Sequence, residues 1–152
     1  MNLIKSFCVN HDVLTPGIYT SRIDGDITNY DIRMRRPNHP PFLENAALHT
    51  IEHLFATFAR NSPYCDQVIY FGPMGCRTGF YFLVRDLPPQ TAINLIIEIF
   101  QKIALYQGEI PGAKAKECGN YKEHDLNGAI WESKKFLPVI EHWTVENLQY
   151  KQ

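Results

Sequence analysis

The sequence predicts an α+β fold: a largely antiparallel β-sheet of about four strands, covered on one face by helices. Two pairs of strand-like segments are each joined by a short connection, which favours antiparallel pairing. Longer segments with apolar residues at helical spacing lie between and after these pairs. The chain has 152 residues, of which 45% are hydrophobic and 20% are charged. This size and composition are typical of one globular domain, which we expect to span residues 1–152.

The first strand pair follows an irregular N-terminal arm, residues 1–16. β-branched and aromatic residues fill 18–23, and an Asp-Gly-Asp turn signal at 24–26 separates them from the segment 27–34. That second segment alternates apolar and polar residues, as a half-buried strand does. Arg33 falls on its polar face. Its strand position alone predicts a solvated charge.

A helix and a second hairpin follow. Apolar residues recur at helical spacing over residues 44–60, and Pro63 ends this helix. The hairpin is predicted over residues 67–86, with strands at 68–71 and 78–85. Two glycines and a proline between these strands force a sharp connection.

The remaining chain is predicted to be mainly helical. Residues 88–107 begin at a Pro-Pro pair and carry an apolar stripe without titratable groups, so this helix should pack in the core. Residues 108–124 are predicted to form loop and turns. A last helical segment, 125–149, should be interrupted near Pro138.

The helix at 44–60 contains the pattern H-x-x-E-H, formed by His49, Glu52 and His53. On a helix the two histidines lie one turn apart on one face, and the glutamate lies beside them. Two such imidazoles can bind one metal ion, and the carboxylate can move a proton next to it. The apolar stripe lies on the opposite side, so we predict a metal site on this central helix rather than two structural histidines.

A catalytic metal site uses three protein ligands and keeps one position open, so a third ligand is needed. Cys118 precedes a glycine in a flexible polar loop. Cys76 ends the turn of the second hairpin, next to Arg77, which would favour its thiolate. Spacing does not distinguish the two cysteines, because either thiolate could be a ligand or an acid/base. The other candidates are Cys8, Cys65, His11, His39 and the carboxylates.

Charge and hydropathy exclude several classes of protein. The net charge is −1 and no basic block occurs, so no nucleic-acid partner is expected. No apolar run approaches the roughly 20 residues of a membrane helix, and no secretory signal is visible. We therefore expect a cytoplasmic protein without a membrane partner, in which the cysteines are free thiols or metal ligands.

Seven stretches of the chain resemble S-ribosylhomocysteine lyases, the LuxS family. They are Ser6-Phe7 with His11, Tyr30 to Arg33, His49 to Leu54, Pro73 to Tyr81, Ile110-Pro111, Cys118-Gly119, and His124 to Leu126 with Gly128-Ala129. They occur in the family's order across nearly the whole chain. The combination of H-x-x-E-H, P-M-G-C-x-T-G and a later C-G is very specific. One departure is Tyr70, at a position where many relatives have an aspartate.

The resemblance implies a role for eight side chains. It implies metal ligands at His49, His53 and Cys118, a general acid/base pair at Glu52 and Cys76, and substrate contacts at Ser6, His11 and Arg33. It also implies a homodimer with sites at the interface and one divalent metal ion per subunit. That ion would be Fe²⁺ in the cell, readily replaced by Zn²⁺ or Co²⁺.

The implied reaction cleaves the small molecule S-ribosylhomocysteine to homocysteine and 4,5-dihydroxy-2,3-pentanedione, the precursor of a quorum-sensing autoinducer. Carbonyl migration along the sugar would precede β-elimination. Two alternatives rest on the motif alone. The first is a zinc metallopeptidase-like hydrolase, because H-x-x-E-H is also the inverted zinc-peptidase pattern. The second is a non-enzymatic structural metal site, closed by four ligands such as His49, His53, Cys76 and Cys118.

Overall fold

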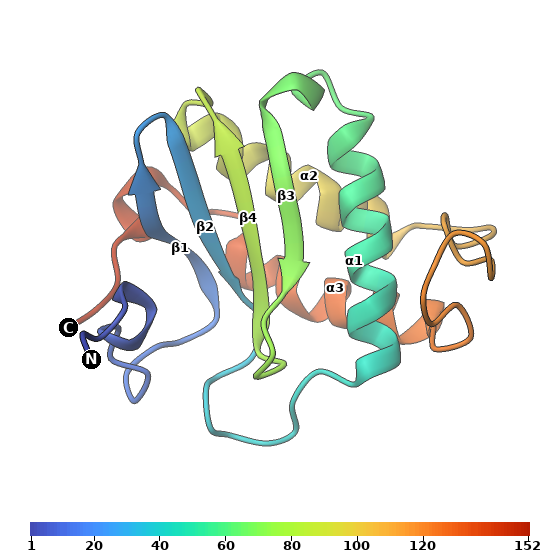
Figure 1. The fold of residues 1–152 in the computed structure, drawn as a ribbon, viewed down its shortest axis with the longest axis horizontal. Coiled ribbons are helices and arrows are strands. Elements are labelled where there is room, and N and C mark those ends of the chain that lie inside the picture. Colours follow the sequence, from blue (N-terminus) through green and yellow to red (C-terminus); the bar gives the residue numbers. More distant parts are fainter.

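Four strands form one antiparallel sheet in the order β1-β2-β4-β3 (Figure 1). The structure, a computed structural model, describes residues 1–152. The strands are β1 (Gly17–Asp24), β2 (Ile27–Arg33), β3 (Val68–Pro73) and β4 (Gly79–Arg85). The two predicted hairpins are present, and they join where β2 pairs with β4 along the middle of the sheet.

Three helices complete the α+β fold, which confirms the predicted class. They are α1 (Asn45–Arg60), α2 (Pro89–Ala104) and α3 (Leu126–Ile140). In Figure 1, α2 and α3 lie behind the sheet, and α1 runs beside β3. Short 3₁₀ turns occupy Lys5–Phe7, Cys65–Gln67 and Val145–Leu148. None of the helices has the length and apolar character that a membrane-spanning segment requires.

An aromatic cluster fixes α1 against the sheet. The ring of Phe55 stacks on Phe71 of β3, with centroids 3.9 Å apart, and meets Phe82 and Phe100 edge-on at 5.0 and 5.6 Å. Phe55 is fully buried, as the apolar stripe of this helix predicted. Burial of one aromatic ring contributes roughly 2–3 kcal/mol, so this face of α1 determines which way the opposite face points.

The predicted helix boundaries need two corrections. The second helix ends at Ala104 rather than at residue 107. The last helical segment is not interrupted at Pro138: α3 continues through it and ends at Ile140. A proline this close to the end removes a single hydrogen bond, to the carbonyl of the exposed Lys134, which water can satisfy.

Residues 141–152, the C-terminal segment, leave α3 and return to β1. The indole nitrogen of Trp143 donates a hydrogen bond to the carbonyl of Ile18, at 2.7 Å. Further on, the ring of Tyr150 stacks on Tyr19 of β1, with centroids 5.1 Å apart. In Figure 1 this red segment passes β1 and ends beside the N-terminus.

Arg33 of β2 is buried, although its strand position predicted a solvated charge. That prediction is wrong: the side chain is only 3% exposed. Its guanidinium donates two hydrogen bonds to Asp31, at 3.1 and 2.6 Å, and a third to Thr78, at 2.9 Å. These partners replace the water that the charge would otherwise require.

Candidate metal centre and cysteine pocket

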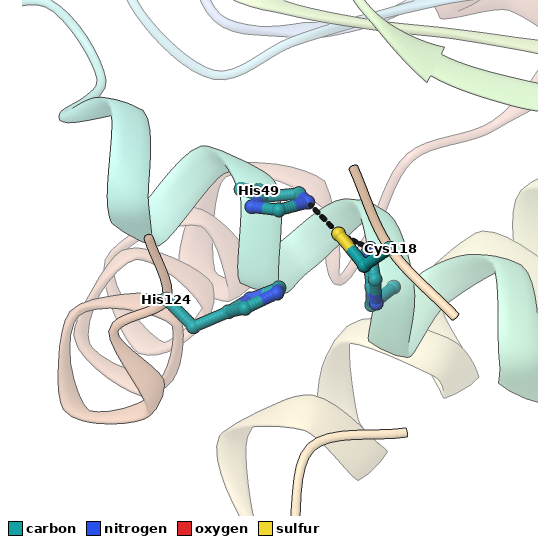
Figure 2. A group of neighbouring side chains, drawn as sticks. His49, Cys118 and His124 are labelled. Atoms are coloured by element: carbon teal, nitrogen blue, oxygen red, sulfur yellow. Dashed lines mark hydrogen bonds between the residues drawn. The ribbon is translucent and has the colours of Figure 1, made fainter. Parts of the chain in front are cut away.

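Helix α1 and the loop between α2 and α3 bring three predicted metal ligands together. His49 and His53 lie one turn apart on the face of α1 away from its aromatic anchor. Cys118 comes from the loop, with its Sγ 3.4 Å from Nε2 of His49 and 3.9 Å from Nε2 of His53 (Figure 2). The two candidates for the third ligand are thus separated, since Cys76 is absent from this cluster.

Both histidines of α1 are held in one tautomer. Nδ1 of His49 lies 2.8 Å from the carbonyl oxygen of Glu123, and Nδ1 of His53 lies 2.8 Å from that of Pro111. A carbonyl oxygen only accepts hydrogen bonds, so each Nδ1 carries the hydrogen. Each Nε2 then presents a lone pair toward Cys118, which is the arrangement of a metal-ligating histidine.

His124 is a fourth member of this group. The ligand atoms of His49, His53, Cys118 and His124 all lie within 4.8 Å of one another. The His124 ring stacks on His49, with centroids 3.9 Å apart and planes at 20° (Figure 2). Burial, together with His49 and His53, lowers the pKa of His124 to about 4, so its ring is neutral near pH 7. Its Nε2 is buried and has no hydrogen-bond partner.

Thr50 connects His124 to α1. Its hydroxyl lies 3.1 Å from the carbonyl of Ala46 and 3.0 Å from Nδ1 of His124, and it accepts the backbone N–H of Asp125 at 2.9 Å. Because the Ala46 carbonyl can only accept, the threonine hydrogen points there and Nδ1 of His124 donates. His124 is therefore in the same tautomer as the other two histidines, with a free lone pair on Nε2.

Gly112 allows the loop to approach α1 closely. Its φ of +72° is strained for any other residue, and a Cβ there would lie 3.2 Å from Nδ1 of His53. The neighbouring Pro111 supplies the carbonyl that orients His53. Gly112 and Pro111 thus place the loop between α2 and α3 against His53, one of the predicted metal ligands.

The donor atoms suit a borderline divalent ion. Imidazole nitrogens with free lone pairs and a thiol that ionises on binding are the ligands that Zn²⁺, Fe²⁺ and Co²⁺ accept. Nε2 of His124 is buried without a hydrogen-bond partner and lies within 4.8 Å of the other three ligand atoms. The residues present therefore fit a metal ion at His49, His53 and Cys118.

Glu52 lies beside this group on α1. It lines a shallow surface pocket of about 310 Å³ together with His53, Phe71 and Gly112. The carboxylate is partly exposed and makes no ion pair. It is thus free to accept or return a proton next to the second histidine.

The remaining predicted residues line a different and larger pocket of about 470 Å³, the cysteine pocket. Ser6 and His11 of the N-terminal arm, Arg33 of β2 and Cys76 of the β3–β4 turn all contribute to it. Cys76 is exposed, as its position in the turn predicted. None of His49, Glu52, His53 and Cys118 lines this pocket.

The structure therefore divides the eight predicted residues into two groups within one chain. The first group lies on α1 and the loop between α2 and α3, and consists of His49, Glu52, His53 and Cys118. The second group lies around the cysteine pocket and consists of Ser6, His11, Arg33 and Cys76. A closed structural metal site with Cys76 as the fourth ligand is not present, because that side chain lies in the second group.

Four further residues were not singled out as site residues from the sequence. His124 belongs to the histidine cluster and is bound by Thr50. Asp31 and Thr78 bind Arg33, which lines the cysteine pocket. A weak signal for His124 existed, because it follows Cys118 by six residues in the same loop. Thr50 lies between the two histidines of the motif. Its partners, His124 and Asp125, are more than seventy residues away, so the sequence does not reveal its role.

The match to known proteins covers nearly the whole chain. A family model described as S-ribosylhomocysteinase (LuxS) matches residues 4–147. The S-ribosylhomocysteine lyase of Phocaeicola vulgatus is 50% identical, over 99% of this chain and 98% of that protein. Those of Finegoldia magna and Borreliella burgdorferi are 50% and 46% identical, over at least 99% of each chain. With its histidines and cysteine so arranged, this chain belongs to the S-ribosylhomocysteinase (LuxS) family.

Proposed function

We propose that this chain is a metal-dependent carbon–sulfur lyase that cleaves S-ribosylhomocysteine to homocysteine and 4,5-dihydroxy-2,3-pentanedione. The observation that carries the proposal is the convergence of His49, His53 and Cys118 in a member of this family. Neither alternative explains the cysteine pocket. A metallopeptidase has no use for a thiol there, and a structural site has no use for a pocket at all.

The reaction defines what the side chains must do. The carbonyl moves along the ribose carbons, and homocysteine then leaves by β-elimination. Each step removes a proton next to a carbonyl and returns one elsewhere, which requires general acids and bases on either side of the sugar. A divalent ion, when bound by His49, His53 and Cys118, supplies Lewis acidity that stabilises negative charge on the sugar oxygens.

We assign the proton transfers to Glu52 and Cys76. Glu52 lies beside His53 and is free of ion pairs, so it can exchange protons close to the metal ligands. Cys76 is exposed at the rim of the cysteine pocket, where a thiolate can reach a bound sugar. Ser6, His11 and Arg33 line the same pocket and would bind the substrate hydroxyls.

We also propose a class of ion for this site, on the basis of its donor atoms. Two imidazoles and one thiolate accept Fe²⁺, Zn²⁺ or Co²⁺, and we propose one ion per subunit, Fe²⁺ in the cell. All four cysteines are free, and Cys76 and Cys118 must stay reduced to function. A ferrous ion and reduced thiols are both maintained in a reducing compartment, so we propose that the protein acts in the cytoplasm.

We further propose that the functional unit is a homodimer whose two sites combine residues of both subunits. Support comes from the division of the site residues into two groups that do not share a pocket within one chain. We call His49, Glu52, His53 and Cys118 the metal group. A two-fold axis can bring the metal group of one subunit to the cysteine pocket of its partner, twice per dimer.

A thiol-release assay tests the activity. The purified protein loaded with Fe²⁺ or Co²⁺ should release homocysteine from S-ribosylhomocysteine, with the diketone detected by mass spectrometry in equal amount. S-adenosylhomocysteine, which lacks a free ribose aldehyde, is the matched control and should release no thiol. Full metal occupancy without homocysteine release would overturn the proposal.

A further inference from the structure

The C-terminal segment brings a tyrosine to the outer face of the sheet. Tyr150 packs its ring on Tyr19, and its hydroxyl donates a 2.6 Å hydrogen bond to Oδ2 of Asp31. Burial and the charge of Asp31 raise the pKa of Tyr150 well above its ordinary value, so the hydroxyl keeps its hydrogen. Tyr150 lies beyond residues 4–147, the part of the chain that the family model matches.

Asp31 binds both Tyr150 and Arg33. The carboxylate is 1% exposed and binds the guanidinium through both oxygens, at 3.1 and 2.6 Å. Oδ2 is shared between Arg33 and Tyr150. Burial opposes the charge of Arg33, but Asp31 and Cys76 outweigh that effect, so the pKa of Arg33 is raised and the charge is retained. The guanidinium is thereby fixed in position and in charge.

Thr78 is the link between Arg33 and Cys76. Its Oγ1 lies 2.9 Å from Nη1 of Arg33 and 3.1 Å from Sγ of Cys76. A guanidinium can only donate, so the threonine oxygen accepts from Arg33. Its own hydrogen is then free to point at the sulfur, and a thiolate is the better acceptor of that hydrogen. The side chain of Thr78 is buried, so water does not compete for the bond.

Few other charged or titratable groups face Cys76. His11 reaches the pocket from the N-terminal arm, and Tyr81 reaches it from β4. Burial raises the pKa of Tyr81, which keeps that ring neutral. The adjacent Arg77 directs its guanidinium to the carbonyl of Leu43, at 3.3 Å. Arg33 is therefore the cation connected to the sulfur by hydrogen bonds.

We propose that Tyr150 is a positioning residue for Cys76: it fixes Asp31, which holds Arg33 against Thr78, whose hydroxyl binds the thiolate. The inference rests on the proposed function, because it concerns the residue assigned there as a proton carrier. It assigns a role in that function to a residue beyond the part of the chain that the family model matches. The reactivity of the sulfur toward an alkylating agent reports on this chain of contacts without substrate and without turnover.

The test measures alkylation of Cys76 by iodoacetamide between about pH 5 and pH 9, with each cysteine followed separately by peptide mass spectrometry. Thr78→Val should slow alkylation at pH 6 about tenfold and leave the rate at high pH unchanged, because a hydrogen bond to a charged group is lost. Thr78→Ser should restore the wild-type profile. Tyr150→Phe keeps the stacked ring and should slow alkylation at pH 6 about threefold.

Tyr19→Phe is the matched control, because it also removes a tyrosine hydroxyl from this face of the sheet. That hydroxyl donates to the carbonyl of Thr15, at 2.9 Å, and makes no hydrogen bond to Asp31. Its alkylation profile should match the wild type, and Cys8 and Cys65 should react alike in all proteins. An unchanged Cys76 profile in Tyr150→Phe, or an equal shift in Tyr19→Phe, would overturn the inference. Homocysteine release by the wild type tests the proposed function separately.

Discussion

Each histidine of the proposed metal site is oriented by a hydrogen-bond partner of its Nδ1 atom. The backbone carbonyls of Glu123 and Pro111 hold two of the rings, and the hydroxyl of Thr50 holds His124. The Nε2 lone pairs consequently converge before any ion is bound. Such outer partners affect metal affinity by roughly 10–100-fold in other metalloproteins, because a freely rotating ligand binds less well.

Loss of the thiol should empty the site. Cys118→Ala removes one of three proposed ligands, so the metal content of the purified protein should fall well below one ion per chain. Inductively coupled plasma mass spectrometry after dialysis against a weak chelator measures it. Cys65→Ala is the matched control, because Cys65 is exposed and lies outside the cluster. Retention of a full metal complement by Cys118→Ala would remove Cys118 from the ligand set.

Proton carriers should behave differently from ligands. Glu52→Gln and Cys76→Ala should retain the metal, since neither side chain belongs to the histidine–cysteine cluster. Turnover should fall by about 10²–10⁴-fold in each, as is typical when a general acid or base is lost. Metal content and homocysteine release measured on the same preparation decide the matter. Near-normal release by either variant would exclude that residue from the reaction.

The positions of single residues are predictable from the sequence where a motif fixes the local geometry. The spacing of His49 and His53 predicts their shared helical face, and the structure has it. The environment of Arg33 is not predictable in this way. Its partner Asp31 is also bound by Tyr150, which is more than a hundred residues away. Tyr150 lies in a segment that Trp143 attaches to β1 through the carbonyl of Ile18. Long-range contacts of this kind leave no local pattern.

Among the elements, β2 and β4 lie close together at Gly79, which pairs with Arg33. A Cβ at this residue would lie 2.2 Å from the carbonyl oxygen of Ile32 and 3.0 Å from Cα of Arg33. Both are backbone atoms, which cannot move without separating the strands. This pairing joins the two hairpins into one sheet and also sets the position of Arg33.

Gly79→Ala should therefore lower the free energy of unfolding by about 3 kcal/mol, measured by urea denaturation. Gly75→Ala, in the β3–β4 turn that precedes Gly79, is the control. A Cβ there would meet no atom within 4 Å, so its effect should stay within about 0.5 kcal/mol. Equal stability of the two variants would contradict the close approach of β2 and β4.

A buried ion pair ties the segment after β2 to α3. Arg35 binds Glu132, and both side chains are at most 10% exposed. Burial raises the pKa of Glu132 above its ordinary value, although Arg35 lowers it in part. Without its partner the carboxylate would be costly to ionise in the folded state. A raised folded-state pKa means that stability present at low pH is lost as the pH rises.

Arg35→Met should accordingly be destabilised by about 3 kcal/mol at pH 8, and by clearly less at pH 5, where Glu132 can bind a proton. Urea denaturation at both pH values, relative to the wild type, measures this difference. Arg85→Met removes an exposed pair with Asp26, 3.0 Å long, and should change stability little at either pH. A pH-independent loss in Arg35→Met would refute the argument.

The elements themselves are largely predictable from the sequence. Turn residues and alternation locate both hairpins, and helical periodicity locates α1 and α2. The pairing of β2 with β4 is not predictable in this way, because it joins segments about fifty residues apart through side chains that suit many registers. The path of the chain after α3 is unpredictable for the same reason: Trp143 could pack on any apolar surface.

For the whole molecule, the division of the site residues into two groups is the dominant fact. The metal group lies on α1 and the loop between α2 and α3, and the cysteine pocket lies between the N-terminal arm, β2 and the β3–β4 turn. Local sequence patterns cannot show this division, since they do not place one element relative to another. The family resemblance anticipated sites at a subunit interface, and this remains a prediction.

Mixed dimers of two inactive variants test whether each site combines residues of both subunits. If the metal group of one subunit works with the cysteine pocket of the other, a Glu52→Gln/Cys76→Ala dimer has one intact site and one doubly altered site. Random reassortment of the two inactive proteins should then restore about a quarter of wild-type activity, because about half the dimers are mixed. Homocysteine release after verified subunit exchange measures the recovery.

A second mixture is the control. Cys76→Ala and His11→Ala alter the same pocket, so mixed dimers of these proteins contain one altered residue at each site and should recover no activity. The absence of recovery in the first mixture, with exchange demonstrated, would place each complete site within one subunit. The lyase activity of the wild type would be unaffected by that result.

The return of the C-terminal segment to β1 also sets an order for biosynthesis. Trp143 and Tyr150 leave the ribosome after every strand of the sheet. While a nascent chain is still being translated, the free edge of β1 and the carboxylate of Asp31 have not yet met these partners. Chains released by premature termination after α3 would keep that edge open to pairing with other strands. We therefore expect such fragments to aggregate and to be degraded, so that the finished enzyme is the form that accumulates.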